Sequence, residues 1–111
     1  MDTNTKGNLG ESKALHYFIS NGYEVFTSFG TASSCDMIVL KDGILQRVSV
    51  KATTSTTRSG KYRVDLRQKG HKSHKTFDNT TSDLLFCYII PEDRIVLLET
   101  DKIDKTSTIT F

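Results

Sequence analysis

The chain has 111 residues, of which 36% are hydrophobic and ten are aromatic, so we expect one compact domain with one core over residues 1–111. Its N-terminus lacks the apolar segment of a secretory signal, and no run approaches the roughly 18 apolar residues of a membrane span, which predicts a soluble, cytoplasmic protein without a membrane partner. The net charge of +2 says little about partners. Both cysteines lie in or beside apolar runs, which favours reduced thiols over a disulfide.

The N-terminal half contains one predicted helix and three predicted strands. The helix covers about residues 8–20 and is ended by Gly22, and a short strand follows over residues 23–27. Two further strands, at 35–40 and 44–51, flank an Asp-Gly pair that is typical of a two-residue hairpin turn. We therefore expect these two strands to be antiparallel neighbours.

The C-terminal half is predicted to be mostly strand. Residues 61–66 are another candidate strand, and an irregular or helical basic segment continues to Thr76. Residues 83–90 and 94–100, joined by Pro-Glu-Asp, predict a second hairpin whose first strand is central and buried. The order of elements predicts an α/β fold, a mixed β-sheet with the N-terminal helix packed on one face.

Positive charge is concentrated in one part of the chain. Between Ala52 and Thr76 there are seven cations and one acid, whereas the rest of the chain has eight cations and 12 acids. Such a segment favours contact with a polyanion, and a solvated lysine-rich loop is the alternative. The candidate DNA-binding residues in it are Arg58, Lys61, Arg63, Arg67, Lys69, Lys72 and Lys75.

Glu11 is a carboxylate on the predicted helix. It shares a face with Leu15 and Phe18, at positions i, i+4 and i+7. A carboxylate on an apolar face is partly buried, and burial requires a cation, a metal or hydrogen-bond donors as partners. The alternative is an ordinary exposed carboxylate in the first turn, favoured by the helix dipole.

The predicted hairpin turn fixes the pairing of its two strands. Because the two residues that flank the turn pair with each other, Asp36 is expected opposite Ser49, with Lys51 one diagonal step away on the same face. Taken singly, Asp36 is explained as a strand cap and Lys51 as an edge cation that reaches water. Together with Glu11 they suit phosphodiester hydrolysis, in which carboxylates hold a divalent ion and a cation offsets developing negative charge.

Three segments resemble the motifs of the PD-(D/E)XK nuclease superfamily: GNLGES on the helix, SSCDMIVLKDG, and then RVSVKATT. Within the superfamily the chain is similar to small intron-associated homing endonucleases and archaeal-type Holliday junction resolvases, over about residues 6–54. The resemblance implies a restriction-endonuclease-like core, a DNA substrate and a Mg²⁺ cofactor for which Mn²⁺ substitutes. Double-strand cutting usually needs two active sites, which implies a homodimer or a higher homo-oligomer.

The resemblance assigns roles to four residues. Glu11 resembles the helix-borne acid, Asp36 the metal-binding aspartate and Lys51 the catalytic lysine. The family also uses the main-chain carbonyl at the position of Val50 as a metal ligand. The predicted catalytic residues are thus Glu11, Asp36, Ser49 and Lys51, and the predicted metal ligands are Glu11, Asp36 and Val50.

The loop before the aspartate matches a region that such enzymes place near the scissile phosphate. Its candidate DNA contacts are Ser33 and Ser34, preceded by Gly30. We therefore expect this loop to contact the substrate.

Ser49 departs from the family pattern, because the residue two before the lysine is normally Glu, or Gln in the homing branch. A serine hydroxyl is short and neutral, so it binds a metal only weakly or through a water. Gln46 does not substitute, because it points to the opposite face from Lys51. The metal site then rests on Asp36, Glu11 and carbonyl groups.

The sequence thus predicts a metal-dependent DNA endonuclease that acts on duplex or branched DNA. The alternative is a weakened or non-cleaving DNA-binding module of the same fold, which Ser49 favours, and a protein-interaction domain is the third reading. A zinc site built on His71 and His74 is disfavoured because no paired CxxC accompanies them. Asp83 is interpreted as a strand-start cap rather than a supporting carboxylate.

Overall fold

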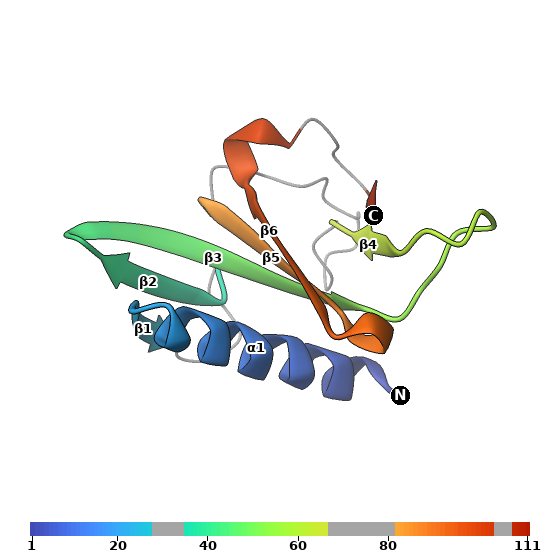
Figure 1. Cartoon of the computed structure of the whole chain (residues 1–111), viewed down its shortest axis with the longest axis horizontal. Helices are drawn as coiled ribbons and strands as arrows, with labels where there is room; N and C mark the ends of the chain where they lie inside the picture. Colours follow the sequence, from blue (N-terminus) through green and yellow to red (C-terminus); the bar gives the residue numbers. More distant parts are fainter. Residues whose placement is uncertain (28–34, 67–81, 104–107) are drawn as a thin grey trace, which may run out of the picture.

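The structure is a computed structural model that describes residues 1–27, 35–66, 82–103 and 108–111 (Figure 1). Its elements, in chain order, are α1 (Thr3–Ser20), β1 (Glu24–Thr27), β2 (Met37–Lys41), β3 (Ile44–Thr53), β4 (Arg63–Asp65), β5 (Leu84–Ile89), the 3-10 helix η1 (Ile90–Glu92), β6 (Arg94–Glu99), the 3-10 helix η2 (Thr100–Lys102) and β7 (Thr108–Thr110). Across these described ranges, no helix combines the length and the apolar character needed to cross a bilayer.

Five strands form a mixed sheet in the order β1-β2-β3-β5-β6, in which β3 and β5 run parallel and the other neighbours antiparallel. α1 packs along one face of this sheet (Figure 1). β4 and β7 form a separate two-stranded antiparallel sheet. The predicted α/β fold with the helix on one face is confirmed, whereas the pairing of the predicted strand at 61–66 with the C-terminus was not predicted.

α1 begins at Thr3, earlier than the hydrophobic pattern predicts. Asp2 is its N-cap, and Asp2 Oδ1 accepts a hydrogen bond from the Thr5 N–H at 2.7 Å. The bond from Thr5 also lowers the pKa of Asp2. The helix ends as predicted, because Gly22 has a φ of +84° and lets the Tyr23 N–H reach back to a helix carbonyl.

Both predicted hairpins form. The two turn residues Asp42 and Gly43 have φ values of 53° and 78°, the positive values that a type I′ turn requires, and the flanking Lys41 and Ile44 pair as expected. The β5–β6 hairpin turns through η1 and Asp93, which also has a positive φ. β3 is longer than predicted, continuing to Thr53.

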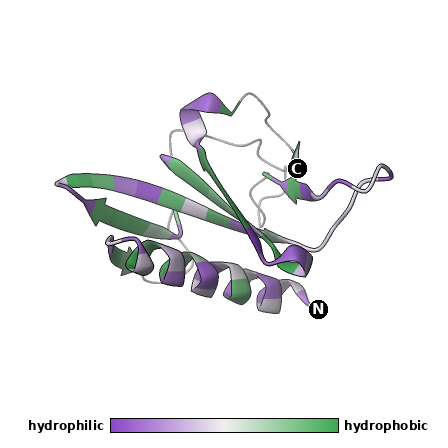
Figure 2. Cartoon of the chain, in the orientation of Figure 1, coloured by the Kyte–Doolittle hydropathy of each residue, from purple (hydrophilic) through white to green (hydrophobic). Residues whose placement is uncertain are grey.

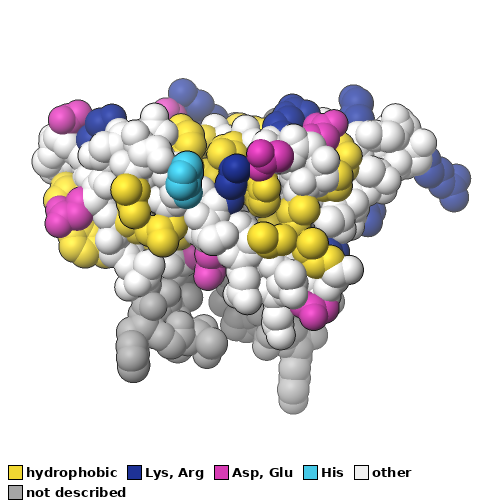
Figure 3. Space-filling model, turned by 60° about the horizontal axis from the view of Figure 1, so that its bottom comes forward, with side chains coloured by type: hydrophobic (Ala, Val, Ile, Leu, Met, Phe, Trp, Pro, Cys, Tyr) yellow, Lys and Arg dark blue, Asp and Glu magenta, His cyan; other side chains and the backbone are white. Residues whose placement is uncertain are grey.

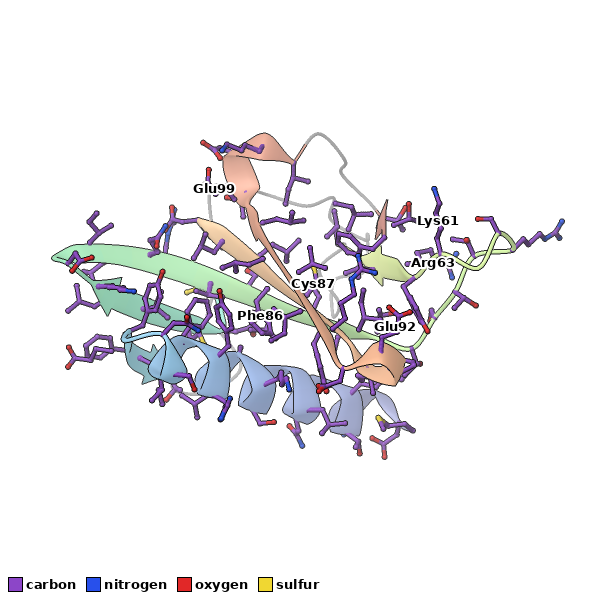
Figure 4. All side chains as sticks on the ribbon, viewed as in Figure 1. Lys61, Arg63, Phe86, Cys87, Glu92 and Glu99 are labelled. Atoms are coloured by element: carbon purple, nitrogen blue, oxygen red, sulfur yellow. The ribbon has the colours of Figure 1, made fainter. Side chains whose placement is uncertain are left out.

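Two hydrophobic clusters cover opposite faces of the sheet. The cluster on the helix side includes Phe18, Val48 and Phe86, and the second cluster is formed by Val64, Leu66, Leu85 and Cys87. Figure 4 shows Phe86 and Cys87 on opposite sides of β5, and Figure 2 shows that β5 is hydrophobic along most of its length. β5 is therefore buried on both faces, as predicted, but it lies between β3 and β6, and β3 is the central strand of the five. Both cysteines are free.

α1 lies unusually close to β3. Its buried face consists of Gly10, Ala14 and Phe18, at i, i+4 and i+8. A Cβ added at Gly10 would lie 3.0 Å from the Cβ of Ala52 and 3.2 Å from Cγ1 of Val50. The small residues of the helix therefore fix its position against the part of β3 that carries the predicted site.

Candidate active site

Asp36 lies directly before β2, where β2 stops pairing with β3. Its N–H donates to the Val48 carbonyl at 2.9 Å, and its Oδ2 accepts a hydrogen bond from the Val50 N–H at 2.6 Å. In an extended strand the N–H and C=O of one residue point to the same side, so the Val50 carbonyl is directed toward the same edge as the Asp36 carboxylate. This edge of β3 presents a carboxylate beside a carbonyl.

Ser49 and Lys51 project from the face of β3 that lies away from α1. The alternate residues of this strand, Val48, Val50 and Ala52, contact the helix or the cluster beneath it. Ser49 and Lys51 are both partly buried. The serine and the lysine therefore share one face, as the sequence predicts.

The register of the first hairpin agrees with the prediction from Lys41 with Ile44 to Met37 with Val48, where the pairs of β2 and β3 end. The predicted pair of Asp36 with Ser49 is not part of this ladder, because the Asp36 N–H donates to the Val48 carbonyl and the Asp36 carboxylate accepts from the Val50 N–H. On the other side of β3, Lys51 pairs with Cys87 of β5. Burial raises the pKa of the Cys87 thiol to about 12, an effect that the positive charge of Lys51 partly opposes. Cys87 is thus an apolar neighbour of the lysine rather than a nucleophile.

Glu11 is exposed on α1, so the prediction that it lies on a buried apolar face with Leu15 and Phe18 was wrong. Leu15 is itself 37% exposed, because the helix turns the face with Gly10 toward the sheet instead. Figure 3 shows hydrophobic and charged side chains interspersed on this side of the molecule. Glu11 nevertheless borders the site, since partial desolvation and, secondly, the Asp36 carboxylate raise its pKa.

A cavity of about 420 Å³ lies beside the C-terminal part of β3, past the point where β2 stops pairing with that strand. Its walls come from the first turns of α1, the last residues of β3, β4 and β7. Among the described residues that line it are the cations Lys6, Lys51 and Arg63 and the acid Asp65. An excess of positive charge in a concave surface attracts phosphate groups.

The donor set fits a hard divalent cation. Glu11, Asp36 and the Val50 carbonyl offer oxygen atoms only, which are the ligands that Mg²⁺ takes together with water. The repulsion between the two carboxylates, visible in the raised pKa of Glu11, is relieved by a bound cation. In the part of the chain that the structure describes, no group of three or more His, Cys, Asp or Glu side chains is placed to hold a metal. Among the described residues, the coordination of an ion held by the Glu11 and Asp36 carboxylates would therefore be completed by main-chain and water oxygens.

Asp83 makes more contacts than a simple cap would. Its Oδ2 accepts hydrogen bonds from the Arg47 backbone N–H at 2.8 Å and from Nε at 3.1 Å, and its Oδ1 accepts one from Nη2 at 3.1 Å. The Arg47 side chain, followed by the Arg47 backbone N–H, lowers the pKa of the Asp83 carboxyl. The pair joins the start of β5 to the middle of β3, on the side of β3 opposite β2.

Three of the predicted DNA-binding residues are described. Arg58, Lys61 and Arg63 are exposed on the loop between β3 and β4 and on β4 itself, and Figure 4 shows Lys61 and Arg63 there. The others lie outside the described residues, as do the two histidines of the disfavoured zinc site; these are Ser33, Ser34, Arg67, Lys69, Lys72, Lys75, His71 and His74.

A family model described as PD-(D/E)XK endonuclease matches residues 1–111. This chain belongs to that family. The resemblance inferred over about half of the chain is therefore confirmed, and it extends to the whole of it.

Among solved structures, a similar protein is a bacterial homing endonuclease, I-Ssp6803I, which is 23% identical in sequence with a TM-score of 0.84. The match covers 100% of this chain and 78% of that one. At this identity the likeness establishes the shared fold. No curated protein sequence matches the chain.

Two cavity residues of this family member were missed by the sequence argument. Lys6 lies one helical turn before Gly10, the residue that touches β3, and this i, i+4 spacing places it on the sheet side of α1. Asp65 alternates with the buried Val64 and Leu66, which marks it as pointing away from the second hydrophobic cluster. The spacing of Lys6 from Gly10 and the alternation around Asp65 can both be read from the sequence, but neither pattern shows which residues these two side chains face across the cavity.

Proposed function

We propose that this PD-(D/E)XK endonuclease uses Mg²⁺, for which Mn²⁺ substitutes, to hydrolyse phosphodiester bonds in duplex or branched DNA. Residues 1–111 act as one nuclease domain. The observation that supports this best is the hydrogen bond from the Val50 N–H to Asp36, which places a carboxylate and a carbonyl on one edge of β3. Lys51, the next residue, lines the adjoining cavity.

The chain's own groups have separate roles in this proposal. When bound by Glu11, Asp36 and the Val50 carbonyl, a divalent ion supplies an activated water and positive charge for the scissile phosphate. Asp36 is held by the Val50 N–H before any ligand binds, which reduces the cost of orienting it. Lys51 lines the adjoining cavity, where its ammonium stabilises the negative charge that develops on the phosphate.

Cleavage of supercoiled plasmid and of a labelled four-way junction tests this function. Both substrates are incubated with Mg²⁺, Mn²⁺ or EDTA, and the variants are Asp36→Asn and Lys51→Met, with Asp101→Asn and Lys102→Met on η2 as matched surface controls. We expect each site variant to lower the cleavage rate by about 100-fold or more, because each removes a group that acts on the reacting phosphate. Full activity of either site variant would refute the assignment. Preference for one substrate separates a homing-type from a resolvase-type role.

A second candidate is a DNA-binding module that no longer cleaves, and Ser49 favours it. The neutral hydroxyl leaves the site with one acid fewer than the family pattern. In this case DNA binds, Mg²⁺ and Mn²⁺ give no cleavage, and Ser49→Glu creates cleavage by adding an oxygen ligand. Cleavage by the unmodified protein excludes this candidate.

We propose in addition that this chain acts as a homodimer or a higher homo-oligomer. One active site cuts one strand at a time, so concerted double-strand cleavage requires a second copy, usually related by two-fold symmetry. Light scattering with and without a duplex substrate measures the oligomeric state. A monomer that linearises plasmid in one binding event would contradict it.

A further inference from the structure

We propose that Lys6 of α1 and Arg63 of β4 together bind the DNA phosphate that adjoins the scissile phosphate. The inference rests on the proposed nuclease function, because that function places the scissile phosphate beside the Asp36 carboxylate and the Lys51 ammonium. It gives a binding role to Lys6, which lies just before the first family motif, and it assigns Arg63 to one phosphate rather than to DNA in general.

The cavity beside β3 is lined by cations from three different elements. Lys6 comes from α1, Lys51 from β3 and Arg63 from β4. None of the ion pairs among the described residues includes any of these three side chains. The one acid among the described lining residues, Asp65, balances at most one of the three charges. Like charges gathered around one cavity repel one another, and a bound anion relieves that repulsion.

Lys6 differs from its neighbours on α1 in its burial. It is partly buried, whereas the other residues from Met1 to Leu9 are exposed. The difference follows from its position one turn before Gly10, the residue that approaches Ala52 of β3. A lysine on a solvent-exposed helix face extends into water, but Lys6 lies on the sheet side, so its side chain runs along the cavity wall.

α1 runs antiparallel to β3, so its first turns lie near the end of that strand. The C-terminal end of the helix is next to Lys41, whose Nζ donates to the Asn21 carbonyl at 2.8 Å and which directly precedes the turn into β3. Farther back along the helix, Gly10 lies against Ala52. Lys6 therefore lies beside the residues that follow Ala52, and Figure 1 shows the N-terminal end of α1 near the end of β3 that leads to β4.

The main chain of Arg63 is fixed to the same end of β3. Its N–H donates to the Ser55 carbonyl at 2.9 Å, and its carbonyl accepts a hydrogen bond from the Thr53 hydroxyl at 2.7 Å. Arg63 also pairs with Thr110 of β7. The guanidinium thus extends from a paired strand, which holds a functional group more precisely than a loop does. Thr53 and Ser55 line the cavity as well, so Lys6 and Arg63 meet at this end of it.

These two cations lie beyond the proposed metal site along β3. From Val50, whose N–H holds Asp36, to Thr53 the strand rises by about 10 Å. The oxygens of a single phosphate do not span that distance, so a phosphate between Lys6 and Arg63 is a neighbour of the one at the metal site. Lysine and arginine commonly contact DNA phosphates, and such contacts fix the register of the strand without reading its sequence.

The first test measures DNA binding without cleavage. The affinity for a duplex is measured with Ca²⁺ in place of Mg²⁺ at several salt concentrations. The variants are Lys6→Met, Arg63→Met and the double variant, with Lys102→Met on η2 as the surface control. We expect each single site variant to weaken binding by about 5- to 30-fold. The double variant should lower the slope of log K against log salt by about 0.9, the value for one phosphate contact.

The double variant also tests whether the two cations share one phosphate. If they do, its loss of affinity is smaller than the product of the two single losses. Independent losses with a slope lowered by about 1.8 would indicate two separate phosphates and overturn the inference. An affinity of Lys6→Met equal to that of Lys102→Met overturns it too. Lys6→Arg keeps the charge and should bind DNA within about twofold of the unmodified protein, whereas a loss as large as that of Lys6→Met would indicate a packing role instead.

The second test identifies the phosphate. In a duplex whose cleavage position has been mapped, the phosphates around the scissile one are replaced singly by neutral methylphosphonates. At a phosphate that adjoins the scissile one, we expect the replacement to weaken binding of the unmodified protein by about fivefold or more and to have little effect on the double variant, which has already lost that contact. Equal sensitivity of the two proteins at each position overturns the inference. If the unmodified protein binds DNA but does not cleave it, the proposed function fails, and the salt slopes still decide whether Lys6 and Arg63 share a phosphate.

Discussion

Replacing Gly10 by Ala tests how closely α1 packs on β3 beneath the candidate active site. In a helix interior, Gly→Ala normally stabilises a protein by about 1 kcal/mol. At Gly10, however, the new Cβ would lie 3.0 Å from the Cβ of Ala52 and 3.2 Å from Cγ1 of Val50, closer than ordinary van der Waals contact. Overpacking costs about 1–3 kcal/mol. We therefore expect Gly10→Ala to lower the free energy of unfolding by about 1 kcal/mol in spite of the better helix propensity.

Gly7→Ala is the matched control, because a Cβ at Gly7 meets nothing within 4 Å on the same helix. It should raise the free energy of unfolding by about 0.5–1 kcal/mol. Urea unfolding measures both variants, and the two should shift the midpoint in opposite directions. Equal stabilisation by the two alanines would refute the close contact between helix and strand. Cleavage should also fall for Gly10→Ala, because a displaced Val50 moves the N–H that holds Asp36.

Three further predictions concern ionisable groups. Because the pKa of Asp83 is lowered in the folded state, its stabilisation is complete above the unfolded pKa of about 4 and is lost as the pH falls through the folded value. Asp83→Asn should thus lower the free energy of unfolding by about 1 kcal/mol or less at pH 7, since the side chains of Asp83 and Arg47 are both 41% exposed. An equal decrease at pH 2 would contradict this. The pKa of Cys87 is raised to about 12, so in a Cys35→Ser background its thiol should react with a thiol reagent only after unfolding in urea. Rapid labelling of the folded protein would show instead that the Cys87 thiol is accessible. Because the pKa of Glu11 is raised in the folded state, the free energy of unfolding falls as the pH rises from the unfolded pKa of Glu11 to its folded pKa. Glu11→Gln should therefore raise the melting temperature of the metal-free protein at pH 7 and abolish the further rise caused by Mg²⁺. The control Glu24→Gln should do neither.

The parts of the fold that follow local rules could be predicted from the sequence. The Asp42-Gly43 turn determines its own pairing, because two consecutive residues with positive φ match the twist of the flanking strands. Gly22 ends α1 for a similarly local reason. The continuous apolar run of β5 requires burial on both faces and therefore a position inside the sheet rather than at its edge. From these features the shared face of Ser49 and Lys51 follows directly.

The parts that depend on distant partners could not be predicted. The periodicity of α1 allows either of two faces to pack on the sheet, one that includes Glu11 and one that includes Gly10. Which face is buried depends on the close approach of Ala52, and the sequence of the helix gives no information about this distance. Likewise Asp83 lies 36 residues from Arg47, so nothing local to either residue signals the ion pair. The pairing of β4 with β7 joins segments separated by most of the second half of the chain. Sequence reasoning therefore predicted candidate site residues on one hairpin and missed the residues that line the cavity beside them.

The chemistry proposed for the site depends on where β2 begins. β2 pairs with β3 only from Met37 onward, so at Val50 the edge of β3 faces the residue just before the strand. Asp36 occupies that place and accepts the Val50 N–H through its side chain, whereas a longer β2 would engage the N–H and carbonyl of Val50 in a regular ladder. An extension of β2 by two residues would thus engage the Val50 carbonyl, the proposed metal ligand, in the strand ladder, although every residue of the family motif would still be present.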